Sequence, residues 1–119
     1  MNEKCWFVRG IQIGDVYIGR LQYHSEGSLA SVDFKWSEAL GKSLLGFYHS
    51  HPGGVPCPSS RDDRTMRAWV KAEGRPMLCG IFSEGDQKCF LYYRTKTNEV
   101  WYKAMRSRIF SNFVIVRPE

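Results

Sequence analysis

Two histidines and an aspartate near the middle of the chain have the residue types and the spacing of a zinc site. His49 and His51 lie two positions apart, and Asp62 follows His51 by eleven positions. Imidazole nitrogens and carboxylate oxygens are common zinc ligands, and three protein ligands leave one of the four coordination positions open to water. These residues therefore predict a zinc-activated water, which is the chemistry of a hydrolase.

The residues around the histidines explain how both side chains could face the same way. Residues 44–51 are apolar and aromatic enough to form a strand. Side chains two positions apart in a strand share a face, so His49 and His51 would point together with Ser50 opposite. The glycine- and proline-rich residues 52–58 then predict a loop.

A helix after this loop is expected to carry Asp62 back to the histidines. Ser59 or Ser60 can cap the helix, and Asp62 and Asp63 then fall in its first turn, where the helix dipole favours carboxylates. Apolar residues continue at helical spacing and predict a buried stripe: Met66, Trp69 and Val70. Each piece alone is also an ordinary structural feature, because strands often carry half-exposed histidines and many helices start with Ser-Asp-type caps. The metal site is predicted from their combination.

This segment resembles the JAMM motif of the MPN-plus (JAB/Mov34-type) zinc metalloproteases, written H-[ST]-H-P-x6-S-x2-D. The match runs from His49 to Asp62 and includes Ser59, three positions before the aspartate. In that family two histidines and one aspartate bind zinc. The resemblance therefore implies that His49, His51 and Asp62 bind Zn²⁺ and that Ser59 stabilises the oxyanion formed during hydrolysis.

The same resemblance implies a general acid/base glutamate upstream of the motif. The opening Glu-Lys-Cys-Trp-Phe-Val-Arg-Gly is similar to the family's E-x-C-G-x-x-x-G, and its Glu3 precedes His49 by 46 positions. Trp6 stands where the family pattern has glycine. Glu26, in a turn-like His-Ser-Glu-Gly-Ser segment, and Glu38, in a short helical piece, remain alternatives. We favour Glu3.

The expected fold class is α+β. The resemblance implies an MPN/JAMM-like (cytidine-deaminase-like) architecture, a mostly antiparallel sheet flanked by helices, and the length fits one domain over residues 1–119. Relatives carry a helix before the catalytic glutamate, which this chain is expected to lack. Residue patterns predict a helical piece at 36–40 and strands at 6–8, 12–19 (with a candidate turn at Gly14–Asp15), 31–34, 44–51, 77–83, 88–94, 100–105 and 113–116.

The resemblance also implies a substrate class. Relatives cleave a peptide or isopeptide bond after the C-terminal tail of a ubiquitin-like protein, so a ubiquitin-like protein or its conjugate is the expected partner. The extended tail could bind by adding a strand to a sheet edge. Glu3 would take a proton from the zinc-activated water and deliver it to the leaving amine. The alternative is a non-catalytic MPN-type scaffold or protein-interaction domain.

Composition narrows the other function classes. The net charge of +5 and the pI near 9.2 keep a nucleic-acid binder in consideration. The basic residues are scattered, however, and no Lys/Arg block or RNP-like aromatic signature is present, which disfavours nucleic acid. A basic surface could equally receive an acidic protein partner. No apolar stretch approaches the roughly 20 residues of a membrane span and no signal peptide is apparent, so a cytoplasmic location without membrane contact is expected.

The cysteines fit a reduced protein. The four cysteines show no C-x-x-C spacing, and three of them fall in apolar, strand-like runs, so no disulfide is expected. Cys57 differs because it lies in the predicted loop between His51 and Ser59. It is either an ordinary loop thiol or a group that approaches the zinc or responds to oxidants.

Overall fold

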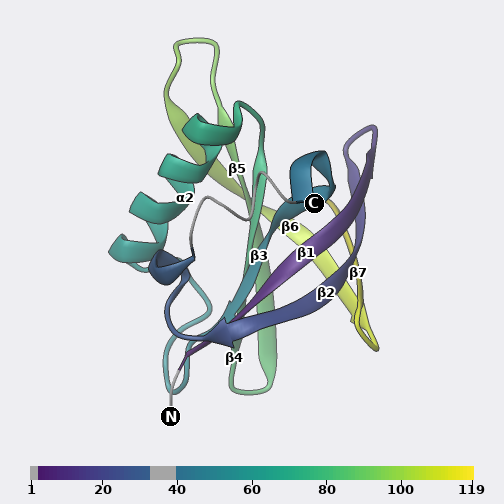
Figure 1. Ribbon diagram of the computed structural model, residues 1–119, viewed down its shortest axis with the longest axis vertical. Coiled ribbons are helices and arrows are strands. Elements are labelled where there is room, and N and C mark those ends of the chain that lie inside the picture. The colour runs from purple at the N-terminus through teal and green to yellow at the C-terminus, as the bar shows by residue number, and fades with distance from the viewer. Residues whose placement is uncertain (1–2, 33–39) are drawn as a thin grey trace.

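The computed structural model describes residues 3–32 and 40–119, and strands dominate this part of the chain. Figure 1 shows one long α-helix, α2, lying along one side of the strands. In chain order the elements are β1 (Lys4–Ile13), β2 (Val16–Glu26), the 3-10 turns η1 (Leu29–Ser31) and η2 (Gly41–Ser43), β3 (Leu44–Ser50), α2 (Ser60–Glu73), β4 (Met77–Ser83), β5 (Asp86–Arg94), β6 (Val100–Phe110) and β7 (Phe113–Pro118).

The strands close into a barrel in the order β1-β2-β7-β6-β5-β4-β3. Neighbouring strands are antiparallel except β3 and β4, which are parallel. Parallel strands need a long crossover, and α2 supplies it between β3 and β4. The residues from Leu44 to His49 are all buried, which is typical of a central strand covered on both faces.

Alternation along the strands divides the core into two layers. One layer fills the barrel and includes Val8, Tyr48 and Val116. The other lies outside the barrel, where Phe47 packs against α2 with its ring 4.8 Å from that of Trp69. The buried stripe predicted for the helix is confirmed at its three positions, Met66, Trp69 and Val70. The helix is therefore held against the strand that carries the histidines.

Tyr48 helps to fix β3 from inside the barrel. Its buried hydroxyl group hydrogen-bonds Ser107 on β6 and lies 3.4 Å from Gln87 on β5. On β4, a Cβ atom at Gly80 would lie 2.3 Å from the Tyr48 ring, so only glycine leaves room for it. These contacts with β4, β5 and β6 fix the side chain of Tyr48, which directly precedes His49.

The predicted α+β class is confirmed only in its coarse form. Most of the predicted strands are present and a helix follows the histidine strand, but the strands form a closed barrel, and in the described residues one α-helix packs outside it. The barrel closes where β2 pairs with β7, from Tyr17↔Val116 to Arg20↔Phe113. These segments lie at opposite ends of the chain, so local residue patterns carry no signal for their pairing.

Some of the elements predicted from local residue patterns are confirmed and others are not. The strand predicted at 12–19 is interrupted by the Gly14–Asp15 turn, where Gly14 adopts a positive φ of 61°, and becomes the ends of β1 and β2. The predicted loop at 52–58 and the helix after it are confirmed. The strand predicted at 31–34 is wrong in its described half, because Ser31 ends the 3-10 turn η1 and no strand follows at Val32. The rest of it, and the helical piece at 36–40 with Glu38 apart from Leu40, lie outside the described residues.

Candidate metal centre

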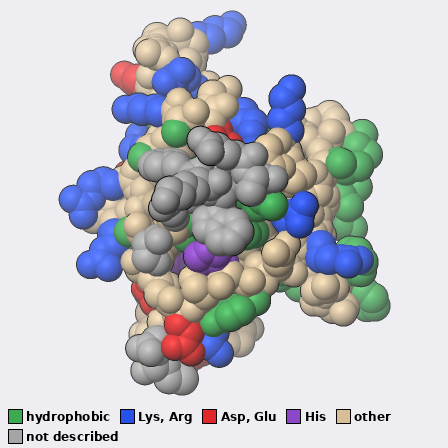
Figure 2. All heavy atoms as spheres, in the orientation of Figure 1, with side chains coloured by type: hydrophobic (Ala, Val, Ile, Leu, Met, Phe, Trp, Pro, Cys, Tyr) green, Lys and Arg blue, Asp and Glu red, His purple; other side chains and the backbone are tan. Residues whose placement is uncertain are grey.

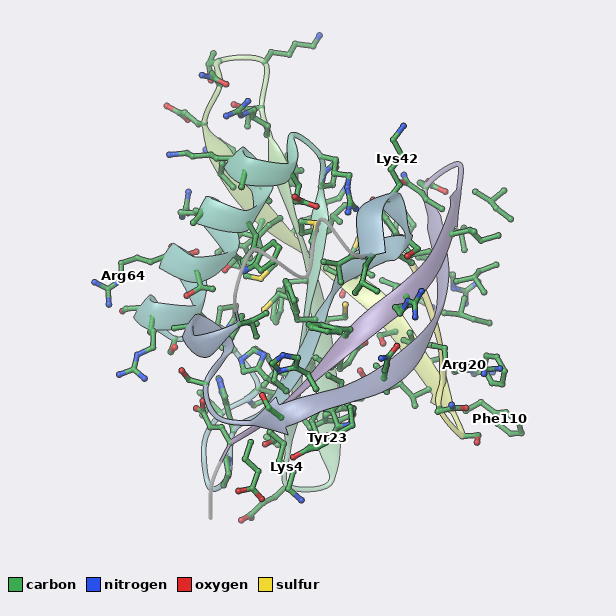
Figure 3. All side chains as sticks on the ribbon, viewed as in Figure 1. Lys4, Arg20, Tyr23, Lys42, Arg64 and Phe110 are labelled. Carbon is green, nitrogen blue, oxygen red and sulfur yellow. The ribbon has the colours of Figure 1, made fainter. Side chains whose placement is uncertain are left out.

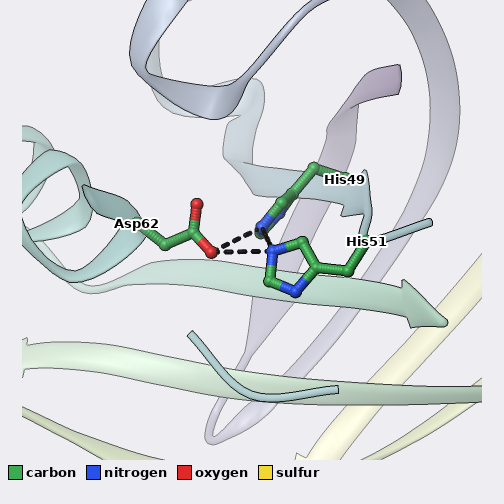
Figure 4. A group of neighbouring side chains, drawn as sticks. All are labelled: His49, His51 and Asp62. Atoms are coloured by element: carbon green, nitrogen blue, oxygen red, sulfur yellow. Dashed lines mark hydrogen bonds and ion pairs between the residues drawn. The ribbon is translucent and has the colours of Figure 1, made fainter. Parts of the chain in front are cut away.

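The end of β3 and the first turn of α2 bring the three predicted ligands together (Figure 4). His49 Nε2 and His51 Nε2 lie 3.0 and 2.9 Å from the same oxygen, Asp62 Oδ2, and 3.0 Å from each other. His49 is fully buried, and His51 and Asp62 are nearly so, with side-chain exposures of 11% and 4%. Strand alternation and the helix start thus place three potential ligand atoms around one point.

The spacing of these atoms fits a single zinc ion. A tetrahedral zinc with bonds of about 2.0–2.1 Å needs its ligand atoms roughly 3.3 Å apart. The three atoms lie 2.9–3.0 Å apart, so small side-chain movements would open the required space. Two imidazoles and one carboxylate are also a donor set that zinc prefers.

The loop after β3 sets the orientation of the His51 ring. His51 Nδ1 lies 3.1 Å from the carbonyl oxygen of Val55, which can only accept a hydrogen bond. Nδ1 therefore carries a proton, and Nε2 of a neutral ring presents a lone pair toward Asp62. Two lone-pair atoms at 2.9 Å repel each other unless a cation, either a proton or a metal ion, lies between them.

Asp62 is fixed by the start of α2 as well as by the histidines. Its Oδ2 accepts a hydrogen bond from the backbone N–H of Ser59, while Ser59 Oγ accepts one from the backbone N–H of Asp62, which forms a capping box. Burial alone would raise the pKa of the Asp62 carboxyl. The hydrogen bond and charge of His49, the Ser59 N–H and the charge of His51 outweigh burial and hold that pKa well below its usual range. The carboxylate is therefore ionised at neutral pH.

Residues 3–107 match the family of prokaryotic homologues of the JAB domain (Prok-JAB). The match spans well over half of the 119 residues and includes every predicted site residue. The chain belongs to this family. The resemblance predicted from the motif is therefore confirmed. No curated protein was found to match the chain.

Glu3, the favoured acid/base, immediately precedes β1 in this JAB domain. Cys5, two residues further on, pairs with His49 on β3. The Glu3 carboxylate lies close enough to Cys5 to help raise the pKa of its thiol, which places Glu3 near this end of β3. The Glu3 carbonyl accepts a hydrogen bond of 2.7 Å from the Gly27 N–H, which ties this end of the chain to the end of β2.

Glu26, one of the two alternatives, lies elsewhere. It pairs with Lys4, on the opposite face of the strand from Cys5, and lines a cleft of about 390 Å³ beside His51. Pro52, Phe82 and Glu84 line the same cleft. Of the three potential ligands, His51 alone lines this cleft.

Two contacts that support the site were not predicted from the sequence. One is the Val55 carbonyl that orients His51. The other is Asp63, which accepts hydrogen bonds of 2.9 Å from the Tyr92 hydroxyl and 2.7 Å from Arg67 Nε. The i,i+4 spacing of Asp63 and Arg67 was a detectable signal for the second contact. Through Tyr92 on β5, Asp63 anchors the turn of α2 that also carries Asp62.

Ser59→Ala should weaken zinc binding and stability together. The substitution removes the acceptor of the Asp62 N–H, and N-cap losses of this kind cost about 1 kcal/mol. Asp62 would keep the Ser59 backbone N–H but lose the constraint on its helical turn, so zinc affinity should fall by about tenfold. Ser59→Thr retains the hydroxyl group and should behave like the unchanged protein in thermal unfolding and zinc titration. If Ser59→Ala bound zinc as tightly as the unchanged protein, Ser59 would not be needed to position Asp62.

Cys57 is expected to be the one cysteine that reacts with iodoacetamide in the folded protein. All four cysteines are free, and three are buried: Cys5, Cys79 and Cys89. Burial, reinforced by the carboxylates of Glu3 and Asp62, raises the pKa of the Cys5 thiol to about 12, and burial raises that of Cys89 to about 12 as well. Because the thiolate is the reactive form, these groups stay inert at neutral pH. Mass spectrometry should find a single modified site, and labelling of a second cysteine before unfolding would contradict the packing described above.

None of the helices in the described residues combines the length and the apolar character that a membrane span requires.

Proposed function

We propose that this JAB domain is a zinc-dependent hydrolase that cleaves peptide or isopeptide bonds after the C-terminal tail of a ubiquitin-like protein. The observation that carries the proposal is the convergence of His49 Nε2, His51 Nε2 and Asp62 Oδ2 on one point beside an accessible cleft. A three-ligand set leaves one zinc position open, which is the arrangement of catalytic sites. A purely structural zinc site would be closed by a fourth protein ligand, and the cluster of described residues has three.

Zinc bound by these residues would supply an activated water and would polarise the scissile carbonyl group. Glu3 would accept the proton of that water and deliver it to the nitrogen of the leaving amine. Ser59 Oγ accepts the Asp62 N–H, which leaves the hydroxyl proton of Ser59 available to donate to the oxygen of the tetrahedral intermediate. In this assignment Ser59 both caps α2 and contacts the reacting group.

Strand addition, the route that the sequence suggested, has an edge available in this barrel. β2 pairs with β7 only over Tyr17–Arg20, so residues 22–26 extend beyond that pairing. A tail added there would run toward Glu26 and the cleft beside His51. A cleft of about 390 Å³ accepts a few small residues, which suits a narrow extended tail better than a folded domain.

A cleavage assay with a panel of fusions tests this proposal. Ubiquitin and bacterial sulfur-carrier proteins would each carry a reporter peptide joined to the tail, through a peptide bond in one set and through a lysine side chain in the other. We expect zinc-dependent release of the reporter directly after the tail, loss of release with a chelator, and recovery when zinc is restored. Stoichiometric zinc without cleavage of any fusion would favour the scaffold alternative.

A further inference from the structure

A second and larger hollow lies on the outside of the barrel. Its volume is about 840 Å³, and it is bordered by the outer faces of β5, β6 and β7 and by the loop residues Pro56 and Cys57. Its lining combines positive charge with apolar side chains such as Phe90 and Ile115. A hollow of this size falls within the range of about 300–1,000 Å³ that is typical of binding sites. Among the described residues, none of the three potential metal ligands lines it, and neither does Glu3 or Glu26.

The charges of this hollow are nearly all of one sign. Four cations line it: Lys88, Arg106, Arg108 and Arg117. All four are exposed, and within residues 3–32 and 40–119 none of them forms an ion pair or a hydrogen bond to a side chain. Glu119 is the one carboxylate side chain in the lining. Clustered cations without anionic partners repel one another, so an anionic ligand would relieve their repulsion.

An exposed apolar row continues from the hollow across the neighbouring strands. Strand register aligns Ile11, Ile18, Ile115 and Arg108 side by side on β1, β2, β7 and β6. The three isoleucines are 59%, 38% and 45% exposed. Figure 2 shows apolar side chains gathered along this edge of the molecule, with Lys and Arg side chains close by.

The next row repeats the combination of apolar groups and arginine. Phe113 is 45% exposed and Phe110 is 80% exposed, and the Arg20 guanidinium lies 4.7 Å from the centre of the Phe113 ring. In Figure 3 the side chains of Arg20 and Phe110 point away from the barrel. Contiguous exposed apolar groups of this extent mark interaction sites.

We propose that this basic-apolar groove, lined by Lys88, Arg106, Arg108, Arg117 and Ile115, binds an acidic segment of a partner protein that carries apolar side chains. Carboxylates of the segment would pair with the cations, and its apolar side chains would cover Ile115 and the adjoining isoleucine row. The binding requires neither the metal site nor hydrolysis, so it does not depend on the proposed function.

Other occupants fit these observations less well. A second copy of the chain would bring its own arginines against these arginines. Nucleic acid is bound by surfaces that are more polar and more positively charged than those that bind proteins, whereas this face carries an exposed row of isoleucines beside its cations. A flat bilayer would leave the hollow unfilled.

The test selects peptides on the intact chain and then maps where they bind. Random 12-residue peptides displayed on phage would be selected against the immobilised, zinc-loaded protein, and the enriched sequences would be measured as labelled peptides by fluorescence anisotropy. We expect enrichment of Asp and Glu next to Leu, Ile or Phe, and affinity that falls as salt rises from about 0.05 to about 0.5 M.

Matched charge reversals locate the site. The double substitution Arg106→Glu/Arg108→Glu on β6 should weaken binding by about tenfold or more, and Lys88→Glu/Arg117→Glu should repeat the effect from β5 and β7, the two strands that flank β6. Arg64→Glu/Lys71→Glu makes the same change in net charge on the exposed face of α2 and should leave binding within about twofold. Thermal unfolding and zinc content should be unchanged in all three variants.

Three results would overturn the proposal. One is enrichment without acidic residues, and another is equal loss of binding in the groove variants and the α2 variant. The third is that another ligand binds more tightly than any peptide and loses its binding in the groove variants. The ligands to compare are a single-stranded DNA oligonucleotide, vesicles with anionic lipid and a second copy of the chain. None of these results bears on whether the ubiquitin-like fusions are cleaved. Each proposal can therefore be contradicted while the other stands.

Discussion

Replacing Asp62 with asparagine is expected to lower zinc affinity by at least about 100-fold and to abolish cleavage. The amide keeps the size of the side chain and an oxygen for the Ser59 N–H, but it removes the negative charge from a buried position shared by two imidazoles. Without that charge the three donors are all neutral and offset none of the positive charge of a divalent cation. Zinc per chain after dialysis and a competition titration against a chelating dye measure the effect.

Asp63→Asn provides the matched control, because it makes the same chemical change one residue along the helix. Asp63 lies 2.7 Å from Arg67 Nε and 2.9 Å from the Tyr92 hydroxyl and does not contact the histidines. This variant should lose about 1 kcal/mol of stability and keep its zinc. Loss of zinc in Asp63→Asn, with zinc retained in Asp62→Asn, would contradict the register of the site.

Glu3→Gln should separate chemistry from metal binding. Glu3 lies outside the three-residue cluster, so the variant should bind zinc as tightly as the unchanged protein. Removing a general acid/base usually slows a reaction by about 10²–10⁴-fold, and we expect a loss of that size in kcat. Cleavage of the responsive fusion and zinc content would be measured on the same preparation.

Glu26→Gln is the natural control for Glu3→Gln, because Glu26 lines the cleft beside His51. If Glu3 is the acid/base, Glu26→Gln should change KM more than kcat. The opposite result, with full kcat in Glu3→Gln and a large loss in Glu26→Gln, would transfer the role to Glu26. Activity that survives both substitutions would leave Glu38 as the remaining alternative.

The parts of the site that the sequence predicted are those set by short-range rules. His49 and His51 share a face because a strand alternates with period two, and Ser59 and Asp62 approach because a capping box spans four consecutive residues. The predicted loop at 52–58 follows from glycine and proline chemistry. Each of these rules acts within about a dozen residues, so a single sequence contains the information.

Long-range features could not be predicted in the same way. Closure of the barrel depends on the pairing of Ile18 with Ile115, which lie at opposite ends of the chain. The Tyr92 hydroxyl on Asp63 depends on how α2 packs on β5. The Val55 carbonyl that orients His51 is a backbone group, and its position depends on the loop conformation rather than on the residue type. The exposed isoleucine row likewise emerges only once the strand register is known.

X-ray absorption at the zinc K-edge of the purified chain reports the ligands of the metal. We expect one zinc per chain with two imidazole nitrogens and oxygen neighbours at about 2.0–2.1 Å, and no sulfur. We also expect the imidazole signal to disappear together with the zinc in Asp62→Asn. A sulfur neighbour at about 2.3 Å, which would place Cys57 on the metal, or a protein that retains no zinc after metal loading, would contradict a site built from His49, His51 and Asp62.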